Sequence, residues 1–493
     1  MSDRDCITLS LVSHTNVGKT TLARTLLRKD VGEVRDEAHV TETSQAYPIL
    51  ETAGACLRLF DTPGLGDTVR LLKRLRGESN PLGWLLAQVW DRFANRPLWC
   101  SQQAIRTVRD DSDVVLYLVN AAEEPEEAGY VQHEFDLLTW ASRPVLLLLN
   151  QTGAARPHGG PGAEAEAARA LEKRWREHAR PWPIVRGVLS LDAFSRCWVH
   201  EGVLFHQIIP LLPEEKRPGM QRCLAAWNER NRALFRGSVA KMAAYLARAA
   251  ADRETLEAAA GAGFLPVGLR LPARGKARAM AALRKRLETG TGALVDALIA
   301  DHGLDGHATV RLRERLQDFS ITGSGALTPT WGAALGGVVS GALGGLAADL
   351  MAGGLSFGGG MVAGALLGAL GGAGLTHAYQ LVQGEDLPGI RWSEGFLRDL
   401  ARQTVLRYLA IAHFGRGRGG YSEVELPEGW RSLVDGILAR YDDRLSAAWQ
   451  TAARQAGGRA EAQRELEGLL TRAAEAILAA GYPEASAFLA VTS

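Results

Sequence analysis

A short segment near the N-terminus has the residue types and the spacing of a phosphate-binding loop. The segment SHTNVGKT, Ser13 to Thr20, lies between an apolar run, Ile7 to Ser13, and a helical stretch, Thr21 to Arg28. Backbone N–H groups at such a strand-to-helix turn, together with the positive end of the helix dipole, form a cradle for a β-phosphate. There Lys19 would offer its ammonium to the β- and γ-phosphates, and Thr20 would offer its hydroxyl to Mg²⁺.

A second motif, DTPG at Asp61 to Gly64, directly follows an apolar run. An acid at a strand end can hold Mg²⁺ through water, and Gly64 can present its N–H to the γ-phosphate. In the HVTET segment between the two motifs, Thr41 could close over the metal and the γ-phosphate, with Thr43 as the alternative. Although Ser13 stands where the usual pattern opens with Gly, the two motifs together predict a nucleoside triphosphate site with Mg²⁺.

The motifs resemble those of the Era, EngA and TrmE group of GTPases, and specifically its YfjP-type branch, in which the G domain precedes a long helical region. The resemblance rests on NVGKT, HVT, DTPGL, NQTG and VLSL, and it covers the N-terminal part of the chain. It implies K⁺-assisted hydrolysis, because Asn16 would bind K⁺, which stands in for an arginine finger. It also implies a slow intrinsic rate, because Leu65 occupies the position of the water-orienting Gln of Ras-like proteins. A second G domain or a protein partner would then accelerate hydrolysis.

The resemblance implies the roles of a nucleotide site for named residues of this chain. The implied catalytic residues are Lys19, Thr41, Gly64 and Asn16, and the implied metal ligands are Thr20, Thr41 and Asp61 for Mg²⁺ and Asn16 for K⁺. The implied nucleotide-binding residues are His14, Thr15, Asn16, Val17, Gly18, Lys19, Thr20, Thr21, Asn150, Gln151, Ser190 and Leu191. At the loop position of His14, a side chain usually points away from the nucleotide.

The base-reading segment NQTG, Asn150 to Gly153, departs from the pattern of the group, which is Asn, Lys, any residue, Asp. That Asp accepts two hydrogen bonds from guanine, and losing such an acceptor costs on the order of a few kcal/mol of discrimination. Gly153 has no side chain that could accept them. Asn150 could still contact the base edge, and the stem of Gln151 could cover the base face. The sequence therefore predicts phosphate binding and leaves the choice between guanine and adenine open.

Short apolar runs alternate with helical stretches in the first part of the chain, which indicates a mostly parallel sheet covered by helices on both faces. The runs are Ile7 to Ser13, Cys56 to Phe60, Asp113 to Asn120, Pro144 to Asn150 and Pro183 to Ser190. We therefore expect an α/β P-loop G domain at residues 1–213, with a helical insertion at 69–105. Trp84, Trp90 and Trp99 of that insertion could pack on the core or form a surface coupled to the switch.

From Glu214 onward Ala, Arg, Glu and Leu recur at helical spacing, which predicts an all-α remainder. We expect a helical domain at 214–320, a Gly-rich apolar hairpin at 321–383 and a helical region at 384–493. Two stretches of the hairpin, Thr330 to Met351 and Gly358 to Val382, are each long enough to cross a bilayer, and their glycines at four-residue spacing would let two helices approach closely. Insertion into a membrane and burial at the centre of a soluble helical domain both remain open.

Charge and composition limit the location and the partners. Arg311, Arg313 and Arg315 precede the hairpin and Arg391 follows it, so both ends could lie on the cytoplasmic side of a membrane, which is the inner membrane in a bacterium. The net charge of +1 gives no basic field, and no specific nucleic-acid partner is predicted. Five cysteines without paired spacing fit a reducing compartment, and Cys56 is expected to be an ordinary strand residue. No signal peptide is predicted.

The sequence supports three hypotheses of function. The first is a GTP-binding and GTP-hydrolysing switch at a membrane, with GTP or GDP, membrane lipid, and a second G domain or another protein as partners. The second is a dynamin-like membrane remodeller with the same chemistry. The third is a nucleotide-binding scaffold with little hydrolysis and relaxed base specificity, which is motivated by Ser13, Leu65 and Gly153.

Overall fold

The computed structural model describes residues 6–15, 17–29, 44–66, 68–75, 80, 83–84, 96–150, 161–191, 197–255, 273–304, 379–382, 389–415, 428–454 and 457–483 of the 493-residue chain. The chain divides into two compact units. The first comprises Met1–Ala233 with the short segments His413–Gly419 and Ala479–Ser493, and the second comprises Leu234–Ala412 and Gly420–Leu478. The division falls within helix α8 (Arg217–Ala251).

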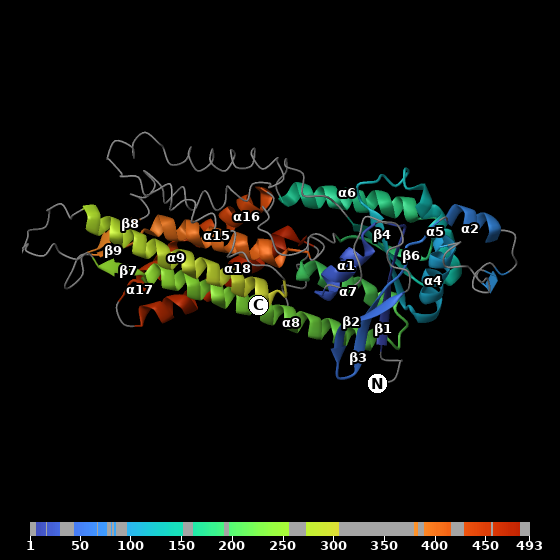
Figure 1. The fold of residues 1–493 in the computed structure, drawn as a ribbon, viewed down its shortest axis with the longest axis horizontal. Coiled ribbons are helices and arrows are strands. Elements are labelled where there is room, and N and C mark those ends of the chain that lie inside the picture. Colours follow the sequence, from blue (N-terminus) through green and yellow to red (C-terminus); the bar gives the residue numbers. More distant parts are fainter. Residues whose placement is uncertain are drawn as a thin grey trace, which may run out of the picture. The chain divides into compact units, whose positions relative to one another are not determined.

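A six-stranded sheet in the order β2-β3-β1-β4-β5-β6 forms the centre of the first unit (Figure 1). Its strands are β1 (Cys6–Ser13), β2 (Gln45–Thr52), β3 (Ala55–Asp61), β4 (Val114–Asn120), β5 (Val145–Asn150) and β6 (Val185–Ser190). Only β2 is antiparallel to its neighbour, and the other strands pair in parallel. The five parallel strands coincide with the five predicted runs, and β2 is an additional strand at the sheet edge. The predicted α/β fold class is confirmed.

Helices cover both faces of this sheet. One face packs against α2 (Thr68–Leu75), α4 (Arg96–Asp111), α5 (Gly129–Ala141) and α6 (Pro161–Ala179), which share a core cluster with Tyr117 of β4 and Leu147 of β5. The other face packs against α1 (Lys19–Leu27), α7 (Trp198–Ile208) and the first turns of α8, where Gly219 lies against Ile7 of β1. The short helix η2 (Ile209–Leu211) follows α7 in the chain. Because both faces are covered, β1, β4 and β5 are buried along nearly their whole length.

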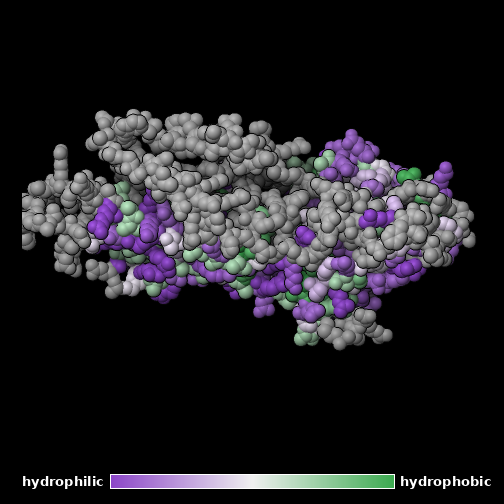
Figure 2. All heavy atoms as spheres, in the orientation of Figure 1, coloured by the Kyte–Doolittle hydropathy of each residue, from purple (hydrophilic) through white to green (hydrophobic). Residues whose placement is uncertain are grey.

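Large hydrophobic side chains of the described residues are buried or half-buried with one exception. Val69 on α2, with 57% of its surface exposed, is the exception among them. On the face drawn in Figure 2, hydrophilic side chains accordingly dominate the described surface, and hydrophobic residues form only small patches.

The second unit is built mainly from helices (Figure 1). Besides the second part of α8, its helices are α9 (Ala273–Asp301), α15 (Glu394–Ala412), α16 (Glu428–Ala439), α17 (Asp442–Ala452) and α18 (Gly458–Gly481). Helices α8 and α9 run antiparallel, because Lys241 forms an ion pair with Asp301 while the hydroxyls of Tyr245 and Thr291 lie 2.7 Å apart. The predicted helical character of the C-terminal region is confirmed.

A small antiparallel sheet in the order β7-β9-β8 adds strands to this helical region. It consists of β7 (Arg253–Thr255), β8 (Tyr379–Val382) and β9 (Gly389–Trp392). Strand β8 is the end of the predicted apolar stretch Gly358 to Val382, so the expectation of a helix is wrong for these residues. The physical reason is that Tyr, Leu and Val suit a strand and that β9 offers a partner in antiparallel register.

The rest of the two apolar stretches, from Thr330 to Met351 and from Gly358 up to β8, lies outside the described residues. Within the described part of the chain, no helix combines the length and the apolar character needed to cross a membrane. The predicted hairpin therefore stays a prediction.

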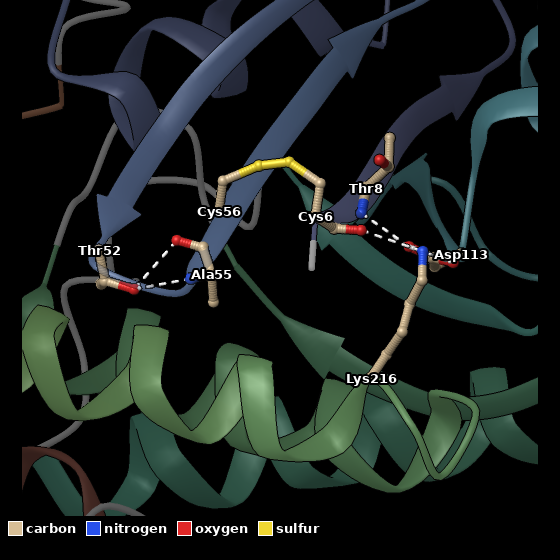
Figure 3. The surroundings of a disulfide bond; sticks show 7 residues. All are labelled: Cys6, Thr8, Thr52, Ala55, Cys56, Asp113 and Lys216. Atoms are coloured by element: carbon tan, nitrogen blue, oxygen red, sulfur yellow. Dashed lines mark hydrogen bonds and ion pairs between the residues drawn. A yellow bond between two sulfur atoms is a disulfide. The ribbon is translucent and has the colours of Figure 1, made fainter. Parts of the chain in front are cut away.

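A disulfide joins Cys6, the first residue of β1, to Cys56 of β3 (Figure 3). The two cysteines are 50 residues apart in the sequence but directly paired in β1 and β3, with their Cα atoms 4.5 Å apart. The expectation that Cys56 is an ordinary strand residue is therefore wrong, because spacing along the chain carries no information about the register of two parallel strands. Next to this pair, the ammonium of Lys216 lies 2.7 Å from both carboxylate oxygens of Asp113.

Candidate nucleotide site

Gly18 closes the turn between β1 and α1. It precedes Lys19, the first residue of α1, and has φ 95° and ψ 27°, in the left-handed region that glycine adopts without strain. Its carbonyl accepts a hydrogen bond from the N–H of Leu22 at 2.9 Å, which begins the helix. The helix thus starts ahead of the predicted Thr21, and the positive end of its dipole lies at the loop.

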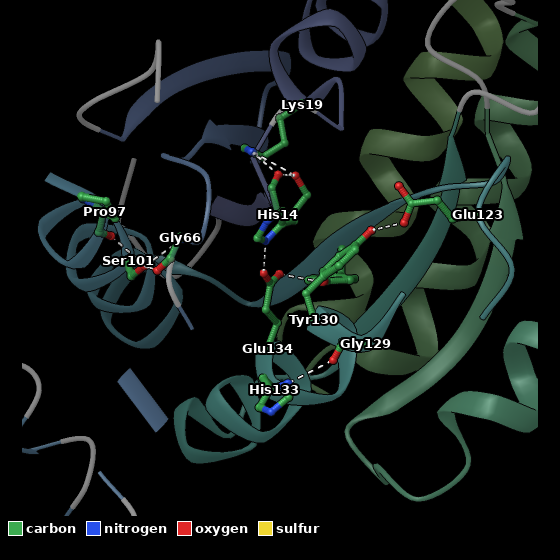
Figure 4. A network of polar contacts seen from close by, with 12 residues as sticks. His14, Lys19, Gly66, Pro97, Ser101, Glu123, Gly129, Tyr130, His133 and Glu134 are labelled. Carbon is green, nitrogen blue, oxygen red and sulfur yellow. Dashed lines mark hydrogen bonds and ion pairs between the residues drawn. The ribbon is translucent and has the colours of Figure 1, made fainter. Parts of the chain in front are cut away.

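Lys19 is buried at the base of the loop, with 8% of its surface exposed. Its ammonium donates to Oγ of Ser13 at 2.9 Å and to the carbonyl of His14 at 3.3 Å (Figure 4). Burial lowers the pKa of this ammonium, whereas the nearby negative charges of Asp61 and Glu134 oppose that shift. Ser13, in place of the usual Gly, thus supplies a hydroxyl that accepts from Lys19. A phosphate oxygen would replace these neutral acceptors with a charged one, which is the stronger partner for an ammonium.

Thr20 and Asp61 form the metal side of the site. Oγ1 of Thr20 donates to Oδ2 of Asp61 at 2.8 Å, which joins the start of α1 to the end of β3. Burial raises the pKa of the Asp61 carboxyl, against the hydrogen bond from Thr20 and the charge of Lys19. The other carboxyl oxygen, Oδ1, is buried without a hydrogen-bond partner among the described residues. An unpartnered buried carboxylate oxygen beside a hydroxyl is a hard-oxygen pair of the kind that Mg²⁺ prefers, so the two residues fit the predicted metal.

Gly64 of the DTPG segment lies directly against the phosphate loop. The N–H of Leu65 donates to the carbonyl of Ser13 at 2.9 Å, which fixes the segment beside the end of β1. A methyl group on Gly64 would lie 2.9 Å from Cγ2 of Thr15 and 3.2 Å from Nζ of Lys19. Because Gly64 has no side chain, its backbone and the Lys19 ammonium can face the same phosphate group.

Helix α4, which begins within the predicted insertion, is hydrogen-bonded to Gly66, the residue that follows DTPGL. The N–H of Gly66 donates to Oγ of Ser101 at 3.1 Å (Figure 4). Trp84 packs against the core cluster of the first unit, as expected for a packing residue, and Trp90 lies outside the described residues. The insertion is therefore bonded to the segment that would respond to a γ-phosphate.

The ends of β5 and β6 carry the predicted base-side residues. Asn150 is fully buried, and its Nδ2 donates to the carbonyl of Val17 at 2.8 Å, which ties β5 to the phosphate loop. Ser190 ends β6, and Leu191 follows it as a buried residue. The N–H of Ser190 donates to Oε1 of Glu172 on α6 at 2.8 Å. Glu172 is thus a supporting residue that the sequence motifs do not indicate.

Asn16, Thr41, Thr43, Gln151 and Gly153 lie outside the described residues, so their roles stay predictions. The remaining predicted residues of the phosphate and metal sites converge on the start of α1. These are His14, Thr15, Val17, Gly18, Lys19, Thr20 and Thr21 of the loop and helix, with Asp61 and Gly64 from the DTPG segment and Asn150 from the end of β5.

A buried polar network beside the loop has no counterpart in the motifs. Glu134 of α5 is fully buried, with Oε1 2.7 Å from Nδ1 of His14 and Oε2 accepting from the Tyr117 hydroxyl at 2.6 Å. The Tyr130 ring lies against the His14 ring, with 4.5 Å between the centroids, and its hydroxyl donates to Glu123 at 3.0 Å (Figure 4). Burial raises the pKa of the Glu134 carboxyl and of both tyrosine hydroxyls.

A parallel sheet with a lysine-bearing glycine loop after β1 and a buried aspartate at the end of β3 defines a P-loop GTPase fold. In agreement, residues 8–151 match the family described as 50S ribosome-binding GTPase. Residues 313–477 match a domain of unknown function (DUF3482). The first match includes the phosphate loop, the DTPG segment and Asn150.

Solved GTPase structures are similar to part of the chain. Era in complex with MgGDPNP and a 16S ribosomal RNA segment is 16% identical, with a TM-score of 0.30, over 43% of this chain and 58% of the Era chain. Toc33 from Arabidopsis thaliana in complex with GDP and Mg²⁺ is 15% identical, with a TM-score of 0.26, over 39% of this chain and 73% of that chain. The FeoB G-domain from Methanococcus jannaschii is 16% identical, with a TM-score of 0.22, over 38% of this chain and 87% of that chain. Comparison with curated proteins gives no match.

Proposed function

We propose that the N-terminal unit binds GTP and hydrolyses it to GDP and inorganic phosphate, as a switch that requires Mg²⁺. The observation that carries the proposal is the meeting of Lys19, Asp61 and Gly64 at the start of α1. The Lys19 ammonium is buried next to Gly64, and Thr20 holds Asp61 through a hydrogen bond of 2.8 Å. The family match over residues 8–151 supports the same reaction class.

Each of these residues has one task in the proposed reaction. The Lys19 ammonium gives up its hydrogen bonds to the oxygens of Ser13 and His14 and donates to oxygens of the β- and γ-phosphates instead. Thr20 and Asp61 hold Mg²⁺, which neutralises charge on those phosphates when it is bound. The N–H of Gly64 stabilises negative charge on the γ-phosphate while water attacks the phosphorus and the bond to the bridging oxygen breaks.

A slow intrinsic rate follows from Leu65. Its side chain is fully buried in the core cluster, and as an alkyl group it neither accepts a proton nor orients water. Another group would therefore have to accelerate hydrolysis. The proposed sources are K⁺ held by Asn16, a second G domain or a protein partner.

Phosphate release by the full-length protein tests the proposed reaction and its cofactors. GTP and ATP are compared with Mg²⁺ or with excess EDTA, and in KCl or in NaCl. We expect turnover that EDTA abolishes, that K⁺ stimulates, and that favours GTP by less than about a thousandfold, because Gly153 has no carboxylate for guanine. Asn16→Ala should erase the K⁺ stimulation and retain binding. Equal rates in K⁺ and Na⁺ would refute the role of K⁺, and tight binding without turnover would favour the scaffold hypothesis.

We also propose that the chain works at a membrane, on its cytoplasmic face, through the Gly-rich hairpin at 321–383. The support is the nearly uncharged composition of its two long stretches. Deletion of residues 330–378, which spares β8, should move the protein from the membrane fraction of lysed cells to the soluble fraction. Gly364→Leu should keep the protein at the membrane with altered helix packing. Full-length protein in the soluble fraction without detergent would contradict this proposal.

A further inference from the structure

A fully buried carboxylate interrupts the apolar face of α5. Val131, Phe135 and Leu138, which share this face with Glu134, belong to the core of the first unit. Burial raises the pKa of the Glu134 carboxyl, because water no longer solvates its charge. A neutral side chain of similar size would fill the same space without that penalty. The contacts of Glu134, and not its packing, therefore have to account for its position.

Those contacts lead to the phosphate loop. Oε1 of Glu134 lies 2.7 Å from Nδ1 of His14, which is the first residue after β1. The ring of Tyr130, one turn earlier on α5, lies against the His14 ring at a centroid distance of 4.5 Å (Figure 4). The other carboxyl oxygen accepts from the Tyr117 hydroxyl at 2.6 Å. Helix α5 therefore holds the imidazole on two sides and turns it away from Lys19.

The backbone of the same histidine supports the reactive groups. Its carbonyl accepts from the Lys19 ammonium at 3.3 Å and from the hydroxyl of Ser13. His14 also pairs with Leu65 in a parallel bridge, directly after Gly64. Holding the His14 side chain on α5 therefore fixes the carbonyl that orients Lys19 and the backbone beside which Gly64 lies.

We infer that Glu134 is a positioning residue of the nucleotide site: through His14 it holds the first turn of the phosphate loop in the shape that aims Lys19 and Gly64 at the phosphates. This inference rests on the proposed nucleotide binding. Because the two residues act through one hydrogen bond, losing either should weaken nucleotide binding, and losing both should add little. Preorganisation of the loop serves GDP and GTP alike, so the affinity for both should fall.

Titration of the full-length protein with a fluorescent GDP analogue, paired with its unfolding temperature, tests the inference. His14→Ala removes the hydrogen bond, and Glu134→Gln exchanges its charged acceptor for the weaker neutral oxygen of an amide, so each change should raise Kd about tenfold. The double variant should stay within about threefold of the single variants, and not reach their product. The unfolding temperature of Glu134→Gln should be unchanged or higher, because the variant removes a buried charge. If Glu134 merely stabilised the fold, its replacement would lower the unfolding temperature and the nucleotide affinity together.

Two further variants distinguish positioning from general damage. His14→Asn should restore most of the affinity that His14→Ala loses, because the amide Nδ2 of Asn takes the position of the imidazole Nδ1. Tyr117→Phe, the matched control, removes the other partner of the same carboxylate and should change Kd by less than about twofold.

An unchanged Kd for a folded Glu134→Gln variant, multiplicative effects of the two single changes, or an equal loss in Tyr117→Phe would each overturn the inference. If Glu134→Gln does not fold, the comparison of His14→Ala with His14→Asn decides, and equal affinities of those two would overturn it. Absence of nucleotide binding by the wild type would instead overturn the proposed function, and this inference with it. Normal binding by the wild type and by Glu134→Gln would overturn this inference alone.

Discussion

Gly64→Ala is the smallest change that the nucleotide site should not tolerate. The added methyl carbon would lie 2.9 Å from Cγ2 of Thr15, 3.1 Å from Cα of Thr15 and 3.2 Å from Nζ of Lys19. Carbon atoms in contact prefer separations of about 3.5 to 4.0 Å. Because Cα of Thr15 is backbone, either the phosphate loop or the DTPG segment has to move. The hydrogen bond between Leu65 and Ser13 opposes that movement.

The size of the effect follows from this overlap. Overpacking of this kind costs roughly 1–3 kcal/mol. If the strain falls on the nucleotide-binding conformation, affinity or turnover decreases about 5- to 150-fold. Hydrolysis of GTP should suffer more than binding of GDP, because GDP has no γ-phosphate for Gly64 to face. Single-turnover phosphate release and a GDP titration, measured side by side, give the two numbers.

Gly129→Ala is the matched control for this experiment. Gly129 begins α5 in the same unit, and a methyl group there meets nothing within 4 Å. Neither affinity nor turnover should change by more than about twofold. Wild-type turnover and GTP affinity in Gly64→Ala would refute the close approach of Gly64 to Lys19.

Three further predictions concern other parts of the first unit. Gly153→Asp should raise the preference for GTP over ATP by about tenfold or more in competition titrations, and an unchanged preference would show that the segment does not reach the base as the resemblance implies. Burial raises the pKa of the Cys197 and Cys223 thiols to about 11. Roughly one such thiol in a thousand is then ionised at pH 8, so mass spectrometry should find both unmodified by iodoacetamide in the native protein, and rapid labelling would contradict the burial. Reduction of the Cys6–Cys56 bond should lower the free energy of unfolding in urea by about 2–4 kcal/mol, with Cys6→Ser as a control that reductant no longer affects; equal midpoints with and without reductant would argue against the bond.

The sequence predicts the central strands well because each is buried on both faces. β1, β4 and β5 are continuous apolar runs, and a run of that length between helical stretches has few other interpretations. β2 escapes prediction because it lies at the edge of the sheet. Most of its side chains are exposed or half-buried, so the strand needs no apolar run, and it contains Pro48.

The phosphate and metal sites are local in sequence, which makes them predictable. The loop and the DTPG segment each follow a strand, and parallel strands bring their ends to one edge of the sheet. The contact between His14 and Glu134 spans 120 residues and belongs to no motif. One signal could have indicated it: a carboxylate on the apolar face of α5, among Val131, Phe135 and Leu138, needs a buried partner.

Two other features, the Cys6–Cys56 pair and strand β8, could not be predicted because they depend on how distant strands pair. Cys6 and Cys56 meet because β1 and β3 are in parallel register, which depends on the packing of the whole sheet. Strand β8 likewise continues an apolar, glycine-rich stretch in the sequence, and pairing with β9 gives these residues a strand conformation. In both cases the deciding interaction is made with a segment distant in the sequence.

Titration of the wild type and of Lys19→Ala with a fluorescent GDP analogue tests the central claim most directly. Lys19 is buried in the loop, and its ammonium donates to two neutral oxygens, those of Ser13 and His14. A phosphate would be a stronger acceptor at the same place. We predict saturable binding by the wild type, no measurable binding by Lys19→Ala, and retention of the folded state in the variant by circular dichroism. Equal affinities of the two proteins would contradict the account, because the nucleotide would then bind without the loop.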